Sequence, residues 1–148
     1  MKSFIFLLFL SLPVFGFEIV DTGSQQPYVD QELSCLAKTV YFETRGEPLN
    51  GQYAVAQVVL NRVNSEMYPN AICEVVYQQY QFSWTASYTN PSAEALTDSV
   101  AVAKDVLNGK LISEFSEVLS FHNTSVNPGW ASRMTFVGQI GHHLFYAP

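Results

Sequence analysis

The stretch GQYAVAQVVLNRV, residues 51–63, leaves almost no polar face when it is drawn as a helix. Its apolar residues are Tyr53, Ala54, Val55, Ala56, Val58, Val59, Leu60 and Val63. A helix that is apolar nearly all round belongs at the centre of a fold. We therefore predict a central helix with Asn50 as its cap. Its polar exceptions are candidates for buried hydrogen bonding: Gln52, Gln57, Asn61 and Arg62.

Two further amphipathic helices are predicted, one on each side of the central one in the sequence. Residues 31–43, QELSCLAKTVYFE, repeat apolar side chains at helical spacing after Asp30, a favourable N-cap. A later helix starts with Ser92 as its N-cap and ends just before Gly109. Between them, residues 72–78, ICEVVYQ, fit a short helix or a strand.

Beyond Gly109 the periodicity becomes alternating. EVLSFHN (117–123) and TFVGQIGHHLFY (135–146) predict two strands on either side of the turn-rich loop NTSVNPGWASRM (123–134). The chain shows no internal repeat. We therefore predict an α+β fold that is mostly helical, with a small C-terminal antiparallel β element.

The N-terminus has the pattern of an export signal. Residues 1–16, MKSFIFLLFLSLPVFG, begin with Lys2, continue as an apolar run and end at Gly16. We interpret them as a secretory signal peptide, with an uncleaved membrane anchor as the alternative. Residues 17–29 are polar and aperiodic and predict a linker, which leaves a single domain at residues 30–148.

Charge and cysteine content narrow the class of function. The 148 residues include 7 Lys+Arg and 13 Asp+Glu, a net charge of -6, and the basic residues are scattered singly. Nucleic acid is therefore not expected as a partner, because phosphate binding draws on clustered Lys and Arg. In an exported chain, Cys35 and Cys73 predict a disulfide. The spacing of histidines and cysteines fits no zinc site, and we expect no metal and no cofactor.

The segment YFETRGEP (41–48) concentrates charge in a chain that has little of it. Glu43 falls beside the buried stripe of its helix, where desolvation would raise the pKa of the carboxyl, as a general acid near neutral pH requires. The structural alternative is that Glu43 forms an ion pair with Arg45 or caps a neighbouring turn. Glu47 follows in the turn, where it either raises the pKa of Glu43 by proximity or holds Arg45 or Arg62 to keep the turn rigid.

Two loops offer groups that suit a sugar. QFSWT (81–85) combines aromatic rings, which pack on the apolar faces of sugars, with polar groups that bond their hydroxyls. A hydrophobic minicore is the alternative. FHNTSVNPGW (121–130) places a histidine and an asparagine at a strand end before a Pro-Gly turn, a favourable place for functional residues. A structural histidine is the alternative for His122. His142 and His143 are adjacent and point to opposite faces of a strand, so at most one can share a cleft with His122.

The order of these segments resembles a known family. CLAKTVYFETRGEPLNGQYAVAQVVLNRV, YPNAICEVVYQ, QFSWT, FHNTSVNPGW and IGHHLFY together resemble the SleB-like cell wall hydrolases, which include the spore cortex-lytic enzymes and their bacterial and phage relatives. The likeness spans roughly residues 33–147. It implies a lysozyme-like α+β domain that cleaves the glycan strands of peptidoglycan between N-acetylmuramic acid and N-acetylglucosamine.

The resemblance also implies roles for individual residues. Glu43 matches the catalytic acid of the family's E-x-R-G-E motif, and Glu47 matches the second glutamate, a supporting residue. Thr44 stands where alanine is common, and His142 stands where asparagine is more usual, so His143 is matched to the family histidine. The substrate-binding residues expected on this basis are Phe82, Ser83, Trp84, Thr85, His122, Asn123, Trp130 and His143.

The scarcity of acids favours one mechanism. No acid occurs between Glu74 and Glu94, and none follows Glu117. A lytic transglycosylase of the kind the resemblance suggests needs one carboxyl, which acts first as acid and then as base. A hydrolase would usually need a second acid about 5 to 9.5 Å away, for which Glu47 is the local candidate. We therefore predict a lytic transglycosylase, with a hydrolytic muramidase or glucosaminidase as the alternative.

Two other classes of function are open. One is a non-catalytic peptidoglycan-binding module, which an intact Glu43 disfavours. The other is an amidase or peptidase that uses Cys35 with His122, which a disulfide to Cys73 would prevent. We expect a monomer that acts on peptidoglycan glycan strands in the periplasm or outside the cell, with no membrane span once the signal peptide is removed.

Overall fold

The structure, a computed structural model, describes the backbone of residues 26–148 and the side chains from residue 30 onward. The predicted signal peptide and residues 17–25 of the predicted linker lie outside the described residues. The helices are α1 (Gln26–Glu43), α2 (Leu49–Val63), α3 (Ile72–Val76) and α4 (Thr97–Leu107). The strands are β1 (Ser120–Asn123), β2 (Thr135–Ile140) and β3 (His143–Ala147). Short 3-10 turns are η2 (Ser83–Ala86), η3 (Ser113–Phe115) and η4 (Ala131–Arg133).

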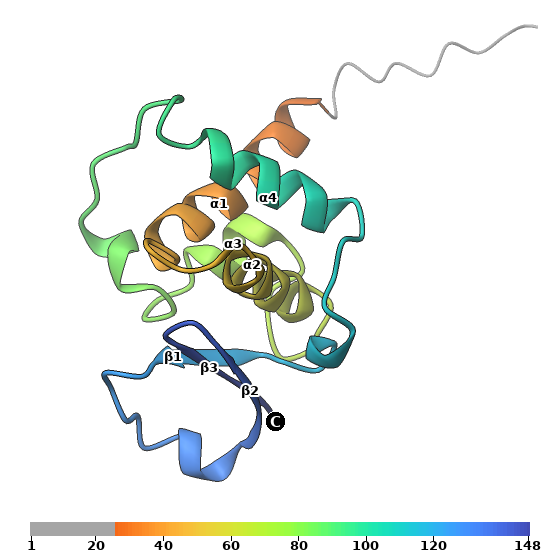
Figure 1. The fold of residues 1–148 in the computed structure, drawn as a ribbon. Coiled ribbons are helices and arrows are strands. Elements are labelled where there is room, and N and C mark those ends of the chain that lie inside the picture. The colour runs from red at the N-terminus through yellow and green to blue at the C-terminus, as the bar shows by residue number, and fades with distance from the viewer. Residues whose placement is uncertain (1–25) are drawn as a thin grey trace, which may run out of the picture.

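The arrangement confirms the α+β prediction. The helices gather in one layer, and the small antiparallel sheet, in the order β1-β3-β2, lies beneath them in Figure 1. α2 is seen almost end-on in this view, with α1 and α4 above it and the sheet below. The cavity described below is lined by residues of both the helical layer and the sheet.

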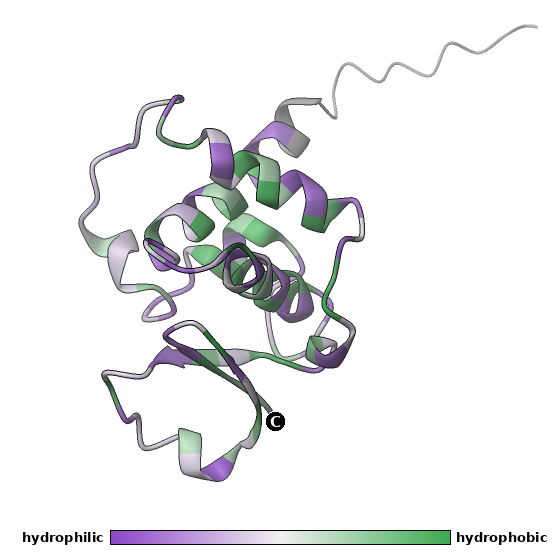
Figure 2. Ribbon diagram, in the orientation of Figure 1, coloured by the Kyte–Doolittle hydropathy of each residue, from purple (hydrophilic) through white to green (hydrophobic). Residues whose placement is uncertain are grey.

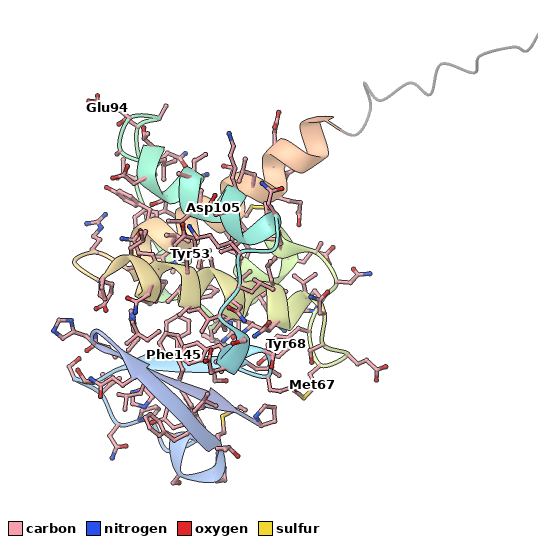
Figure 3. All side chains as sticks on the ribbon, turned by 45° about the vertical axis from the view of Figure 1, so that its right-hand side comes forward. Tyr53, Met67, Tyr68, Glu94, Asp105 and Phe145 are labelled. Atoms are coloured by element: carbon pink, nitrogen blue, oxygen red, sulfur yellow. A yellow bond between two sulfur atoms is a disulfide. The ribbon has the colours of Figure 1, made fainter. Side chains whose placement is uncertain are left out.

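α2 is the central helix, as its apolar pattern predicts. Ala56 and Val59 belong to a buried cluster that α2 shares with α1, α3 and α4. Val55 and Val58 belong to a second cluster with Phe145 of β3, which lies between the sheet and the helices (Figure 3). Figure 2 shows hydrophobic residues on the helix faces that meet around α2. Burial on both sides is the reason the sequence of α2 has so little polar surface.

All four polar exceptions of α2 make hydrogen bonds to backbone groups, and Gln57 and Arg62 are themselves buried. The Gln57 side-chain amide makes two hydrogen bonds with the backbone of Ile112. Its oxygen accepts from the N–H at 2.7 Å, and its NH₂ group donates to the C=O at 2.9 Å. Asn61 donates to two carbonyl oxygens of the segment that follows Ile112, each at 2.8 Å. Arg62 Nε donates to the Leu119 carbonyl at 2.8 Å. These bonds fix the connection that leads from the helical layer into the sheet.

The start of α1 differs from the prediction. The helix begins at Gln26, four residues before Asp30, so the last part of the predicted linker is helical. A proline, Pro27, is tolerated there because the first-turn N–H groups of a helix have no intrahelical partner. The ambiguous segment 72–78 resolves as the short helix α3.

The predicted caps of the other two helices are also wrong. Pro48 is the N-cap of α2, and Asn50 lies inside its first turn. The Ser92 hydroxyl accepts a hydrogen bond from the Ala95 N–H at 3.2 Å, but it caps a separate turn, and α4 begins only at Thr97. In both places a good capping residue lies near the helix start without occupying the cap position.

The C-terminal element contains three strands where two were predicted. Residues 135–146 fold as a hairpin, in which β2 and β3 pair in antiparallel register from Ile140 opposite His143. Gly141, with φ +56°, makes the reversal, since a residue without Cβ adopts positive φ without strain. The predicted strand 117–123 is extended only from Ser120 onward.

Cys35 and Cys73 form the predicted disulfide, which joins α1 to α3 with 5.3 Å between the Cα atoms. Within the described part of the chain, no helix has the length and apolar character needed to cross a bilayer.

Candidate active site

Glu43 is the last residue of α1 and lines a cavity of about 370 Å³. Burial raises the pKa of its carboxyl to about 6, against an opposing effect from the positive charge of Arg62. Desolvation therefore outweighs the nearby charge. A carboxyl with a pKa near 6 is still about one-tenth protonated at pH 7, far more than an ordinary glutamate, which is the property of a general acid.

The cavity has two walls. One is the segment that follows α3 and includes Phe82 and Ser83. The other is the sheet side, with His122 and Asn123 from β1 and His143 from β3. Its volume is within the range of roughly 300 to 1,000 Å³ that is typical of ligand pockets. Five of the eight predicted substrate-binding residues therefore meet Glu43 around one space.

The other three predicted substrate-binding residues lie outside this lining. Trp84 stacks on Phe42 with ring centroids 4.7 Å apart, and it also meets Tyr88 edge-on at 5.2 Å, so it belongs to an aromatic minicore. The Thr85 hydroxyl donates to a backbone carbonyl within its own turn at 2.8 Å. Trp130 packs edge-on against the His122 ring at 5.5 Å and does not itself line the cavity.

The sequence suggested that Glu47 could hold an arginine, and the structure shows a different partner. Its side chain is only 4% exposed, and it binds the β2–β3 turn: Oε2 accepts from the His142 N–H at 3.0 Å, and Oε1 lies 3.1 Å from His142 Nδ1. Arg45 instead stacks over the Tyr41 ring at 4.7 Å, and no ion pair joins it to Glu43 in the described chain. Glu47 thus ties the start of α2 to the hairpin that carries His143.

The two adjacent histidines have different environments. His142 is largely exposed at the turn, whereas His143 is buried and lines the cavity. Burial lowers the pKa of His143, although the Glu47 carboxylate, 4.0 Å from Nδ1, acts in the opposite direction. His143 Nδ1 is buried and has no hydrogen-bond partner. The neutral imidazole is therefore the favoured form in the cavity wall.

Sequence reasoning missed several lining residues and one charge. Tyr80, Gln81, Phe121 and Val126 also line the cavity. Gln81 is part of the QFSWT motif and Tyr80 directly precedes it, so the motif located this wall without identifying each of its lining residues. Arg62 was singled out as a polar exception of α2 and as a possible partner of Glu47, and the helical pattern gave no indication that its charge would act on Glu43.

Gly141 is expected to be intolerant of a side chain. A Cβ at this position would lie 1.9 Å from Glu47 Oε2 and 2.8 Å from Pro48 Cδ, so Glu47 would have to leave its bonds to His142. We expect Gly141→Ala to lower the free energy of unfolding by about 2 kcal/mol, measured by urea denaturation. Gly109→Ala is the matched control, because Gly109 has φ +92° but nothing within 4 Å of its Cβ position. Equal losses in both variants would mean that the contact with Glu47 has no energetic weight.

Comparison with known proteins places this geometry in a family. Residues 46–146 match the Cell Wall Hydrolase family, which is more than half of the chain. The chain belongs to the cell wall hydrolase family. It is 35% identical over 123 residues to a spore cortex-lytic enzyme of Bacillus subtilis, and 32% identical over 123 residues to one of Oceanobacillus iheyensis. These alignments cover 80% and 81% of this chain but 38% and 43% of the relatives, so it spans less than half of their length.

Solved structures of this family share the fold. The catalytic domain of the Bacillus cereus SleB protein superposes with a TM-score of 0.66 at 30% identity, over 79% of this chain and 90% of that domain. The catalytic domain of the germination-specific lytic transglycosylase SleB from Bacillus anthracis gives a TM-score of 0.65 at 31% identity, over 78% of this chain and 93% of that domain. The described chain therefore corresponds to the catalytic part of these cell wall hydrolases.

Proposed function

We propose that this protein cleaves the glycan strands of peptidoglycan between N-acetylmuramic acid and N-acetylglucosamine, with Glu43 as the catalytic acid. The observation that carries the proposal is the position of the Glu43 carboxyl in a cavity lined by aromatic, amide and imidazole groups. Burial there raises the pKa of this carboxyl to about 6. Aromatic rings suit the apolar faces of sugar rings, and the polar groups suit their hydroxyls and acetamido groups. The family membership and the names of the relatives agree with this substrate.

The proposed reaction is that of a lytic transglycosylase. Protonated Glu43 gives its proton to the glycosidic oxygen as the bond from that oxygen to the anomeric carbon of the muramic acid breaks. The resulting carboxylate then accepts the proton of the muramic 6-hydroxyl, whose oxygen bonds to the anomeric carbon. The products are a 1,6-anhydromuramic end and a new free hydroxyl on the glucosamine, and Glu43 returns to its starting state.

The distribution of carboxylates supports this route over hydrolysis. Among the described residues that line the cavity, Glu43 is the only carboxylate. Glu47, the candidate second acid, is engaged by the N–H and the ring of His142 and is not part of the lining. A hydrolase would need a second carboxylate free to activate water or to attack the sugar.

The proposed cellular compartment is supported by the proposed substrate and by the disulfide. The Cys35–Cys73 bond fits an oxidising compartment, so we propose an exported protein that works in the periplasm or outside the cell. The disulfide also removes Cys35 as a nucleophile, which disfavours the amidase or peptidase alternative. The protein is expected to act as a monomer.

Mass spectrometry of the soluble products from purified peptidoglycan tests the reaction type. We expect muropeptides that end in 1,6-anhydromuramic acid, lighter by one water than the corresponding reducing ends. Reducing ends alone would show hydrolysis and overturn the single-carboxyl mechanism. Release of amino groups with intact glycan would overturn the proposed bond specificity.

A further inference from the structure

Tyr80 is exposed at the rim of the Glu43 cavity in an unusual backbone conformation. Its relative exposure is 92%, and it is part of the cavity lining. Its φ is +67°, and within the described chain it is the only residue other than glycine with positive φ. Single exposed aromatic residues are common on protein surfaces, so exposure alone would indicate nothing. The combination with backbone strain needs an explanation.

The strain arises in a tight turn. The Gln81 N–H donates to the Gln78 carbonyl at 3.1 Å, which places Tyr80 at the third position of a four-residue turn. Positive φ at that position favours glycine or asparagine, because a Cβ crowds the following carbonyl. The turn would form with less strain if a smaller residue stood there. The fold therefore gains nothing locally from a tyrosine at this point.

Packing of the Tyr80 ring does not compensate for the backbone strain either. Neighbouring aromatics of the same segment are used structurally: Tyr77 bonds the Tyr88 hydroxyl at 3.0 Å, and Trp84 stacks in the minicore. The Tyr80 ring is left in solvent instead. Strained residues with no structural benefit cluster at ligand-binding sites, where the surrounding structure holds them in place.

The other residues of the rim define the ligand chemistry. Val126, 54% exposed, lies on the wall formed by the sheet side, and the exposed Asn123 is close to it in the same lining. An aromatic ring, an aliphatic side chain and a primary amide suit a pyranose ring, which has an apolar face and hydroxyl edges. We propose that Tyr80 is a substrate-binding residue that packs its ring on a sugar of the glycan strand at the mouth of the Glu43 cavity. The assignment rests on the proposed function for the class of ligand.

The test uses variants that separate ring loss from strain. Tyr80→Asn removes the ring but suits positive φ, and Tyr80→Phe keeps the ring. With soluble uncrosslinked glycan strands, we expect Tyr80→Asn to raise KM about 3- to 10-fold with little change in kcat, and Tyr80→Phe to stay within about twofold of the wild type. The urea midpoint of Tyr80→Asn should equal or exceed that of the wild type, because the strain is relieved. Phe136→Ala, which removes an exposed ring that does not line the cavity, should leave KM unchanged.

Binding measurements keep the test independent of catalysis. In the Glu43→Gln background, calorimetric titration with the same glycan strands should show the matching increase in Kd on Tyr80→Asn. If the protein binds glycan through Tyr80 but the wild type cuts nothing, the proposed reaction fails while the Tyr80 assignment holds. An unchanged KM and Kd, a lower urea midpoint for Tyr80→Asn, or no glycan binding at all would overturn the assignment.

Discussion

Glu43→Gln is expected to reduce the release of soluble muropeptides from peptidoglycan by about 10³-fold, because general acid–base catalysis is worth roughly 10² to 10⁴-fold and one group supplies both steps here. Glutamine keeps the shape and the hydrogen-bonding edge of the side chain but cannot donate or accept the catalytic proton. The measurement is the rate of muropeptide release from purified sacculi. Glu74→Gln, which neutralises an exposed carboxylate on α3, is the control and should retain full activity.

The stability of the same variant should change in the opposite direction. The pKa of Glu43 is raised from 4.5 to about 6 in the folded protein, so the folded state binds more protons than the unfolded state between these values. The contribution of Glu43 to stability therefore falls as pH rises from about 4.5 to 6, by up to about 2 kcal/mol, and does not change further above that range. Glutamine carries no charge, so Glu43→Gln should match the wild type near pH 4 and exceed it at pH 8. An inactive variant that is also less stable at pH 8 would indicate a structural role for Glu43.

Removing the disulfide is expected to produce the largest loss of stability. Cys35 and Cys73 are separated by 38 residues, and closing a loop of that length stabilises the folded state by about 4 kcal/mol in the chain-entropy account. The double variant Cys35→Ala/Cys73→Ala should lose about 3 to 4 kcal/mol in urea denaturation, a large share of the total stability of a small domain.

Removing the disulfide should also destabilise the arrangement of the active site. The disulfide joins the helix that ends in Glu43 to the helix that precedes the Tyr80–Ser83 wall. The temperature at which activity is lost should therefore fall together with stability. Wild-type protein unfolded under reducing conditions is the matched comparison and should show the same loss. A loss below about 1 kcal/mol in both experiments would mean that the bond contributes little beyond the packing of α1 on α3.

The central helix could be predicted because its sequence pattern is a direct consequence of its burial on both sides. Gln57, Asn61 and Arg62 could likewise be identified as polar groups with hydrogen-bond partners inside the fold, since a polar residue on an otherwise apolar helix must find a partner. The partners themselves lie more than 50 residues away in the sequence, and no local pattern names them.

The hairpin could not be predicted for a related reason. Residues 135–146 read as one continuous alternating run, and the reversal at Gly141 is held by Glu47, which lies 95 residues before His142 in the chain. The role of Glu47 could not be predicted for the same reason. The sequence suggested a nearby arginine as its partner, whereas its actual partner is His142 in a distant turn. Contacts of this range appear only when the chain is folded.

The residue types of the cavity loop predicted its possible roles but not which residue takes which role. Aromatic and hydroxyl residues at positions 81–85 suggested a sugar-binding loop or a minicore, and the structure contains both: Phe82 and Ser83 line the cavity, while Trp84 packs in the minicore. Tyr80 belongs to the same aromatic-rich loop but was not among the predicted substrate-binding residues, because residue type alone gives no sign of a positive φ at tyrosine. The partial burial of Glu43 could be predicted from its place beside the apolar stripe of its helix, whereas its assignment as the acid came from the resemblance to the family's E-x-R-G-E motif.

The most direct test of the single-acid account is the titration of Glu43 itself. The carbon-13 shift of its side-chain carboxyl, assigned by comparison with Glu43→Gln, should follow pH with a midpoint of about 6, and kcat/KM should fall as pH rises through the same value. A midpoint near 4.5, with activity that persists undiminished above pH 7, would show that the carboxyl is ionised when the bond breaks and would contradict the account.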